Sequence, residues 1–131
     1  MPAALVQAAR AVRERAYAPY SGFKVGAALE TAGGQIAVGC NVENATYGLT
    51  ICAERSAIFR AIADGHRPGE FTRIVVVADT DEPTPPCGAC RQLLWEFCGD
   101  IEIILANLER VTARYRTKEL LPVPFDDHFL K

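Results

Sequence analysis

The sequence predicts an α/β sandwich built on a mixed β-sheet, and two observations lead to this fold class. In the second half of the chain, apolar runs typical of strands alternate with helical patterns, which indicates parallel strands joined by helical crossovers. In the first half, two β-rich runs separated by a short glycine-containing connection indicate an antiparallel hairpin. A chain of 131 residues with 50% hydrophobic content suits one core, so we expect a single domain over residues 1–131.

The expected elements follow in chain order. Residues 3–17 form an amphipathic helix whose arginines lie off the apolar stripe, and this helix must end before Pro19. The hairpin strands cover residues 23–31 and 35–43. The remaining elements are a helix with Thr50 as its expected N-cap, a strand buried on both faces, a second helix and two further strands. They span residues 50–63, 73–79, 87–98, 101–107 and 110–116.

Charge and cysteine content exclude several classes of protein. A formal net charge of -2 gives no positive field to collect nucleic acid or an anionic membrane, so a small neutral or polar partner fits better. No apolar run approaches the roughly 20 residues needed to span a bilayer, and the N-terminal segment lacks the apolar core of a secretion signal. Five cysteines form an odd set without a disulfide spacing pattern. We therefore expect a cytoplasmic protein with reduced thiols.

Two short stretches, TICAERSAIFRAI and PPCGACRQLLWEF, carry the expected chemistry. Both place thiols at a helix N-terminus, where free N–H groups and the helix dipole favour the thiolate. If the two helices lie side by side, Cys52, Cys87 and Cys90 face one point. Three thiolates around a tetrahedral zinc ion leave one position open, as in catalytic sites. Glu54 then stands where a general acid and base is needed to move protons between water and a substrate nitrogen.

Each part of this pattern has a simpler explanation when it stands alone. A lone C-x-x-C is shared by redox sites, structural zinc sites and chance, and a lone C-A-E is weaker still. Together and in this order they match the zinc-deaminase signature, with cysteine replacing the usual histidine. Cys40 and Cys98 have no partner at ligand spacing and are expected in the core. His66 and His128 lack the placement of a ligand or base.

Three thiolates create an electrostatic difficulty, because with Zn²⁺ they give a formal charge of -1 and weaken the acidification of water. Arg55 immediately follows Glu54, and Arg91 immediately follows Cys90. Each arginine is next in sequence to a residue of the site, and its guanidinium is expected to hydrogen-bond a thiolate sulfur. The alternative is that both arginines are solvated, which is the commoner fate of a helix arginine.

The motifs FKVGAAL, NVENATYG, CAERSAI and PCGACRQ, together with the LLPVPF tail, resemble those of the small, homotetrameric, three-cysteine cytidine deaminases. NVENATYG discriminates best, since the cysteine motifs are shared by deaminases of other bases. The resemblance implies a three-layer α/β/α sandwich with a five-stranded mixed sheet and one Zn²⁺ per chain. It also implies hydrolytic deamination of cytidine and 2'-deoxycytidine to uridine and 2'-deoxyuridine, with release of ammonia, in pyrimidine salvage.

The resemblance also implies roles for residues that bind the nucleoside. Asn41 and Glu43 match the pair that hydrogen-bonds the ribose 3'-hydroxyl, and a carboxylate there would repel a nearby phosphate. Phe23 resembles the phenylalanine that packs on the substrate. The backbone N–H of Ala53 would hold the base carbonyl. The catalytic and metal roles fall to Glu54 and the three cysteines named above.

Two aromatic residues complete the expected site. Phe125 resembles the aromatic that reaches a neighbouring subunit's site and stacks on the pyrimidine, although the sequence leaves open whether it acts in its own subunit or packs in a local core. Tyr47 is expected to line the site. One departure is Pro85, where many relatives carry serine, so that a hydroxyl near the leaving ammonia is lost.

Two other functions remain open at this point. The chain could deaminate another cytosine-bearing substrate, such as a nucleoside antibiotic or a polynucleotide, although the net charge and the lack of a basic stripe disfavour the polynucleotide. It could also be a non-catalytic zinc or thiol-redox module. Glu54 and the ribose motif disfavour such a module, because a structural zinc site needs a fourth ligand and no adjacent carboxylate.

Overall fold

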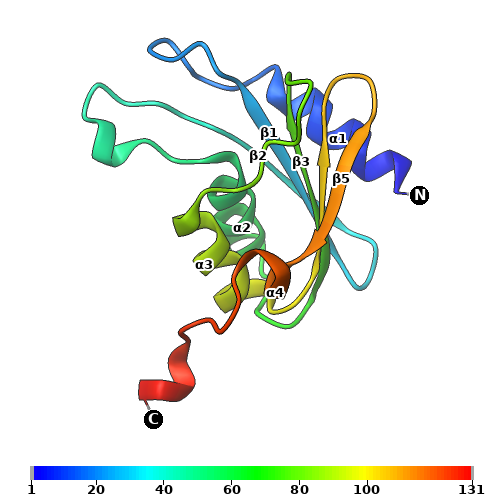
Figure 1. Ribbon diagram of the computed structural model, residues 1–131, viewed down its shortest axis with the longest axis vertical. Coiled ribbons are helices and arrows are strands. Elements are labelled where there is room, and N and C mark those ends of the chain that lie inside the picture. Colours follow the sequence, from blue (N-terminus) through cyan, green and yellow to red (C-terminus); the bar gives the residue numbers. More distant parts are fainter. Residues whose placement is uncertain (1, 131) are drawn as a thin grey trace.

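The computed structural model describes residues 2–130, and within them a five-stranded sheet has the strand order β2-β1-β3-β4-β5 (Figure 1). The strands are β1 (Val25–Thr31), β2 (Ile36–Cys40), β3 (Phe71–Ala78), β4 (Glu102–Ala106) and β5 (Val111–Arg116). The β3–β4 pair is parallel, and the other neighbouring pairs are antiparallel. The predicted five-stranded mixed sheet is therefore confirmed.

The two helical crossovers differ from each other. α3 (Gly88–Cys98) joins β3 to its parallel neighbour β4, as expected. α2 (Ala53–Ala63) leads from β2 to β3, but β1 lies between these two strands. The reason is that β1 has two free edges: one pairs with β2 in the hairpin and the other pairs antiparallel with β3 along its whole length.

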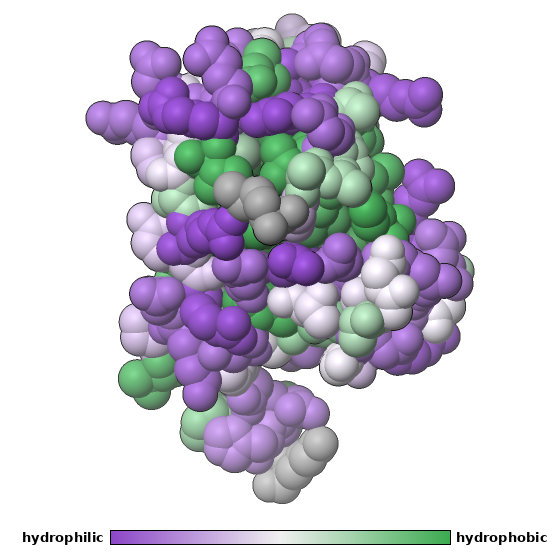
Figure 2. All heavy atoms as spheres, turned by 90° about the vertical axis from the view of Figure 1, so that its right-hand side faces the viewer, coloured by the Kyte–Doolittle hydropathy of each residue, from purple (hydrophilic) through white to green (hydrophobic). Residues whose placement is uncertain are grey.

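Helices cover both faces of the sheet, which confirms the three layers (Figure 1). α1 (Ala3–Arg13) lies on one face, where Leu5, Val6 and Ala9 are buried against the sheet. Gly26 permits this contact, because a Cβ at that position would meet the carbonyl of Ala9. Figure 2 shows the face that carries α1, with an apolar band between two polar zones. No helix within residues 2–130 has the length and apolarity to span a bilayer.

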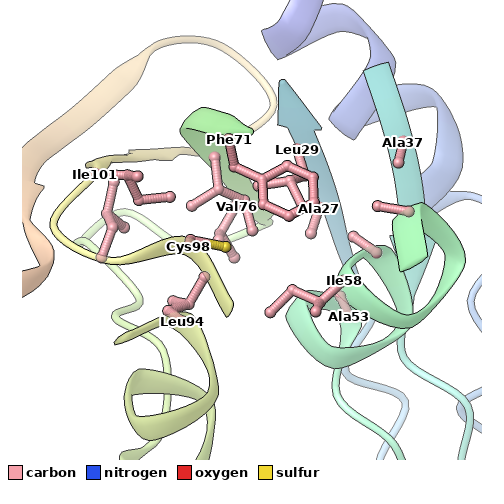
Figure 3. Packing of buried hydrophobic residues seen from close by; sticks show 14 of the residues in the cluster. Ala27, Leu29, Ala37, Ala53, Ile58, Phe71, Val76, Leu94, Cys98 and Ile101 are labelled. Carbon is pink, nitrogen blue, oxygen red and sulfur yellow. The ribbon is translucent and has the colours of Figure 1, made fainter. Parts of the chain in front are cut away.

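α2 and α3 cover the opposite face and enclose the larger part of the core (Figure 3). Cys98 lies in this cluster beside Leu94, and burial raises the pKa of its thiol to about 12. The expectation that Cys98 is a core residue is confirmed. Gly39 in β2 lets α2 lie against the sheet, since a Cβ there would meet the backbone of Ser56 and Ala57.

Two helix boundaries differ from the sequence-based expectation. α1 ends at Arg13 rather than near residue 17, because the chain then turns and Tyr17 forms a bridge with Val42. Thr50 is not the N-cap of α2: Ile51 is still paired with Val42, so the helix begins only after Cys52. The strand pairing thus delays α2 by two residues and makes a cysteine its N-cap.

Beyond β5 the chain forms a short helix, α4 (Thr117–Leu120), and then a tail that ends in a 3-10 turn, η2 (Asp127–Leu130). The tail extends away from the sheet on the side of α3 (Figure 1). It is held to α3 by hydrogen bonds from Gln92 Nε2 to the Phe125 carbonyl, at 2.7 Å, and from Trp95 Nε1 to Asp126, at 3.1 Å.

Candidate active site

Three cysteines meet between the starts of α2 and α3. Cys52 is the N-cap of α2, Cys87 is the N-cap of α3, and Cys90 lies in the first turn of α3. Their sulfur atoms all lie within 4.8 Å of one another, and those of Cys87 and Cys90 are 3.4 Å apart. Sulfur ligands of a tetrahedral zinc ion, each at about 2.3 Å, are separated by about 3.8 Å. The cluster therefore has the size and donor chemistry of a zinc site.

The surroundings of the cluster favour negative charge on the sulfur of Cys52. Arg55 Nη2 donates a hydrogen bond to Cys52 Sγ at 3.3 Å, as expected from the sequence. A hydrogen bond from the Cys90 thiol, together with Arg55, lowers the pKa of Cys52 to about 5, whereas the contact with Cys52 and burial raise the pKa of Cys90. Arg55 Nε is buried without a hydrogen-bond partner in the described structure, and an anionic sulfur cluster would satisfy it.

Arg91 differs from the expectation that it hydrogen-bonds sulfur. Its Nε donates to the carbonyl of Pro86 at 2.8 Å, and its Nη1 donates to the carbonyl of Leu120 at 2.9 Å. These carbonyls lie just before α3 and at the end of α4, so the guanidinium ties the two segments together. Arg91 therefore holds the loop that carries Cys87 and leaves the sulfur atoms to Arg55.

Glu54 lies in a cavity next to the cysteine cluster. The cavity has a volume of about 190 Å³, and Phe23, Asn41, Cys52, Ala53, Glu54 and Thr84 are among the residues that line it. Glu54 is only 5% exposed, and its burial raises the pKa of the carboxyl to about 7. A carboxyl that titrates near neutral pH is suited both to accept and to donate a proton.

A second and more polar pocket of about 340 Å³ adjoins the cavity at Thr50. It is lined by Glu43, Tyr47, Tyr20 and Ser21. Glu43 accepts hydrogen bonds from the backbone N–H groups of Tyr20, at 2.9 Å, and Ser21, at 3.1 Å, and from the Ser21 hydroxyl. These bonds, led by that of the Ser21 hydroxyl, lower the pKa of Glu43. The two pockets together form one binding region, which is more enclosed beside Glu54 and more open beside Glu43.

Asn41 lines the cavity beside Glu54 and ties it to the sheet. Its Nδ2 donates to the carbonyl of Phe23 at 2.7 Å, and its Oδ1 accepts the backbone N–H of Val25 at 2.9 Å. The amide therefore fixes the backbone on both sides of residue 24. It retains one further donor and one further acceptor position for a ligand. Phe23 itself is 42% exposed and lines the cavity.

The remaining candidates lie apart from the cavity or at its edge. Tyr47 is 76% exposed and packs its ring edge-on against Tyr20 at 6.3 Å. Phe125 lies in the tail, 58% exposed and stacked on Phe129, and does not line the cavity of its own chain. His66 contacts Glu70, at 3.7 Å, and the ring of Phe71, while His128 contacts Asp126.

Among the lining residues that sequence reasoning missed are two with hydroxyl groups, Ser21 and Thr84. Ser21 holds Glu43, and Thr84 lines the cavity three residues before Cys87. The turn sequence APYSGF gave a signal for Ser21, because a serine before glycine in a turn commonly hydrogen-bonds nearby groups. Thr84 had no such signal, since only the path of the loop after β3 brings it to the cavity.

The sequence is similar to those of known cytidine deaminases. Residues 2–106 match the family model described as the cytidine and deoxycytidylate deaminase zinc-binding region. A cytidine deaminase of Halalkalibacterium halodurans is 49% identical over 122 residues, which cover 92% of this chain and 91% of the relative. A probable cytidine deaminase of Dictyostelium discoideum is 45% identical over 126 residues, covering 95% of this chain and 84% of the relative.

Among solved structures, a cytidine deaminase from Burkholderia pseudomallei is similar with a TM-score of 0.92 and 52% identity. The match covers 95% of this chain and 99% of that one. These matches agree with the paired cysteine motifs: the family model covers most of the chain, the relatives are nearly half identical, and the fold is shared. The chain belongs to the cytidine and deoxycytidylate deaminase family and carries its zinc-binding region.

Proposed function

We propose that the chain is a zinc-dependent cytidine deaminase, which hydrolyses cytidine and 2'-deoxycytidine to uridine and 2'-deoxyuridine and releases ammonia. Residues 1–131 would act as one catalytic domain. The observation that carries this proposal is the buried Glu54 in a small cavity beside three cysteines whose sulfur atoms lie within 4.8 Å of one another. Metal ligands and a carboxyl that titrates near neutral pH are the two parts that this hydrolysis needs.

In this proposal Cys52, Cys87 and Cys90 hold one Zn²⁺ per chain. Zinc, when bound, supplies Lewis acidity that makes water nucleophilic at neutral pH. The N-termini of α2 and α3 and the Arg55 guanidinium reduce the negative charge that three thiolates impose on the site. Arg91 supports the same arrangement indirectly, through the Pro86 carbonyl next to Cys87.

Glu54 moves the protons of the reaction. It accepts a proton from the water that adds to C4 of the cytosine ring and delivers that proton to N3, and it then carries the proton of the new C4 hydroxyl to the departing amino group. Water thereby adds across the N3–C4 bond, the bond from C4 to the amino group breaks to release ammonia, and a C4 carbonyl forms with no redox change. The pKa of Glu54, raised to about 7 by burial, allows both directions of transfer without a second acid.

The two adjoining pockets suit the two halves of a nucleoside. The cavity beside Glu54 would take the base, with the Ala53 N–H on the base carbonyl and the Phe23 ring against the pyrimidine. The open pocket would take the sugar, whose 3'-hydroxyl would be bound by Glu43 in that pocket and by Asn41 from the cavity side. Because Glu43 has a lowered pKa and stays ionised, it would repel a 5'- or 3'-phosphate and favour the nucleoside over the nucleotide.

The exposed tail supports a homotetramer with shared active sites. Phe125 is exposed, lies outside its own cavity and stacks on Phe129, so it is available to reach a neighbouring subunit. In this proposal it stacks on the neighbour's pyrimidine, and Tyr47 lines the rim of the sugar pocket. We further propose a cytoplasmic location and a role in pyrimidine salvage, with no nucleic-acid or membrane partner.

A second candidate is deamination of another cytosine nucleoside. A blasticidin-S deaminase of Bacillus cereus is 30% identical over 109 residues, covering 77% of this chain and 76% of the relative. Cytidine is favoured because the cytidine deaminase relatives reach 49% identity over more of the chain. A non-catalytic zinc or redox module is disfavoured, since Glu54 would then be a buried carboxyl without a purpose.

An ultraviolet assay of the zinc-loaded protein tests the proposal. Cytidine, 2'-deoxycytidine, their 5'-monophosphates and blasticidin S are assayed in parallel, and ammonia release is measured independently. We expect turnover of both nucleosides and a loss of at least about tenfold in kcat/KM for the monophosphates. Turnover of blasticidin S without turnover of cytidine would favour the second candidate, and no turnover of any substrate by zinc-loaded protein would refute a deaminase function.

A further inference from the structure

Thr84 lines the cavity beside Glu54 but has no part in the mechanism described above. It is half-buried and lies in the loop that leads from β3 to Cys87. Its hydroxyl oxygen lies 2.8 Å from the hydroxyl oxygen of Thr80. The direction of this hydrogen bond decides whether Thr84 can offer a ligand a donor or an acceptor.

Thr80 fixes that direction. A threonine hydroxyl carries one proton and can donate only once. The Thr80 hydroxyl donates to the carbonyl of Glu82, with an oxygen–oxygen distance of 2.7 Å. The bond between the two hydroxyls must therefore be donated by Thr84. With its proton committed to Thr80, the Thr84 oxygen can act toward a ligand only as an acceptor.

Asn107 holds Thr80 in this position. Its Nδ2 donates to the carbonyl of Thr80 at 3.0 Å, and its Oδ1 accepts the backbone N–H groups of Glu109, at 2.9 Å, and Arg110, at 2.8 Å. Asn107 is only 6% exposed, and it follows β4, the parallel neighbour of β3. The loops after these two strands are thus tied together, and the Thr84 acceptor is preorganised.

We propose that Thr84 is a specificity-determining residue, whose oxygen accepts a hydrogen bond from the exocyclic amine of the substrate. This proposal rests on the deamination proposed above. At C4, cytidine presents an amino group, which donates, whereas uridine presents a carbonyl oxygen, which only accepts. Two acceptors facing each other cannot form a hydrogen bond, so Thr84 selects the amine over the product carbonyl.

The substitution Thr84→Val tests this role, because it removes the oxygen and keeps the branched shape. The zinc-loaded variant is assayed for kcat/KM with cytidine and for the inhibition constant of uridine. We expect kcat/KM to fall about tenfold, as for one lost hydrogen bond, while uridine inhibits as well as before or better. Thr84→Ser should stay near the wild type. Thr72→Val, an exposed threonine on β3, is the matched control.

Thr80→Val provides a second and opposite test. This substitution removes the acceptor of the Thr84 proton, so that Thr84 can turn its hydroxyl and donate to a carbonyl. We expect the inhibition constant of uridine to fall by about tenfold, at an unchanged melting temperature of the protein. A purely structural role of Thr80 would weaken the binding of cytidine and uridine alike.

Two results would overturn the proposal, and they differ in meaning. If the wild type deaminates cytidine and Thr84→Val has the same ratio of uridine inhibition constant to cytidine KM, the role of Thr84 is wrong and the proposed function stands. If zinc-loaded wild type does not deaminate cytidine, both proposals fall. Should Thr84→Val not fold, the pair Thr84→Ser and Thr84→Ala gives the same comparison between a retained and a removed oxygen.

Discussion

The cysteine cluster and the sugar-side loops are two adjoining parts of one site, and different forces hold them. The cluster stands on regular secondary structure: its cysteines occupy the first positions of α2 and α3, which pack on the sheet through a buried core. The sugar-side loops are held by hydrogen bonds from their own polar side chains. Asn41 fixes Phe23 and Val25, and Glu43 fixes the loop at Tyr20.

This difference separates the residues proposed for catalysis, at the cysteine cluster, from those proposed to bind the sugar. Residues at the cluster can change without loss of the helices, because the core beneath them is apolar and extensive. Asn41 and Glu43 have two tasks at once, since the polar atoms that would bind the sugar also hold the backbone. Substitutions at the cluster should therefore change activity alone, whereas substitutions at the sugar side should change activity and loop order together.

Metal removal should have the largest effect. Exhaustive chelation is expected to abolish activity, because the open position for water is lost, and to leave the sheet and helices folded on their own core. Metal analysis should give about one zinc per chain in active protein, and circular dichroism should show the retained fold. Re-addition of zinc should restore activity and magnesium should not. Full activity of metal-free protein would contradict the scheme.

Glu54→Gln should come next, with a loss of about 10³-fold or more in kcat. The amide keeps the size of the side chain but cannot accept or carry the proton. Zinc content should match the wild type, and the melting temperature should be equal or higher, because the burial that raises the pKa of Glu54 makes its carboxylate unfavourable in the folded state at neutral pH. Glu96→Gln on the exposed side of α3 is the control. Substantial turnover by Glu54→Gln would remove Glu54 from the central role.

The same contrast explains what the sequence could predict. The sheet, the helices and the cysteine cluster follow from local patterns: apolar runs, helix starts, and the spacing of Cys87 and Cys90. Cys52 was predicted to lie beside Cys87 and Cys90 because two helices on one face of a sheet can bring their N-termini together. The existence and type of these strands and helices are determined by short-range rules, and the structure agrees with them apart from two helix boundaries.

The parts that escaped prediction depend on contacts between distant segments. The insertion of β1 between β2 and β3, the delayed start of α2 and the direction of Arg91 toward Leu120 are set by pairings that no local pattern contains. Thr84 is a further example, because its place in the cavity follows from the loop that Asn107 and Thr80 hold.

Glu43→Gln should separate recognition from chemistry. We expect KM for cytidine to rise about 10- to 100-fold with a smaller change in kcat, because a charged hydrogen bond to the sugar is lost while Glu54 is untouched. Ser21→Ala is the matched control: it loosens Glu43 but removes no group from the sugar. Since the pKa of Glu43 is lowered, the carboxylate persists through neutral pH and KM should be flat there. Equal effects of both variants would assign Glu43 to loop order alone.

Arg55→Ala should lower kcat about tenfold and change the melting temperature little. The loss of its hydrogen bond to Cys52 leaves the three thiolates less neutralised, which raises the pKa of the nucleophilic water. The pH profile of kcat should therefore shift to higher pH. Arg60→Ala on the same helix removes only an exposed ion pair with Asp64 at 3.9 Å and should match the wild type. An unshifted profile with wild-type kcat would show that the hydrogen bond from Arg55 to Cys52 does not tune the reaction.

The C-terminal tail can be compared with the cysteine cluster and the sugar-side loops as a third part of the proposed site. Of the substitutions considered, Phe125→Ala in this tail should have the smallest effect on activity. We expect a rise of about fivefold in KM for cytidine, as for one lost aromatic stacking contact, with kcat and zinc content unchanged. Phe129→Ala should do less, because Phe129 is the stacking partner of Phe125 rather than the proposed contact to the base. A larger effect of Phe129→Ala would exchange the two roles.

Mixing variants decides which subunit Phe125 serves. Subunits with Glu54→Gln lack the proton carrier but retain Phe125, and subunits with Phe125→Ala retain Glu54. If the phenylalanine reaches a neighbour, mixed assemblies contain sites with an intact Glu54 from one chain and an intact Phe125 from the other. Such sites should recover the wild-type KM, whereas a phenylalanine that serves its own chain would leave KM at the value of Phe125→Ala. The measurement thus tests at once the proposed assembly and the role of Phe125, which lies outside the cavity of its own chain.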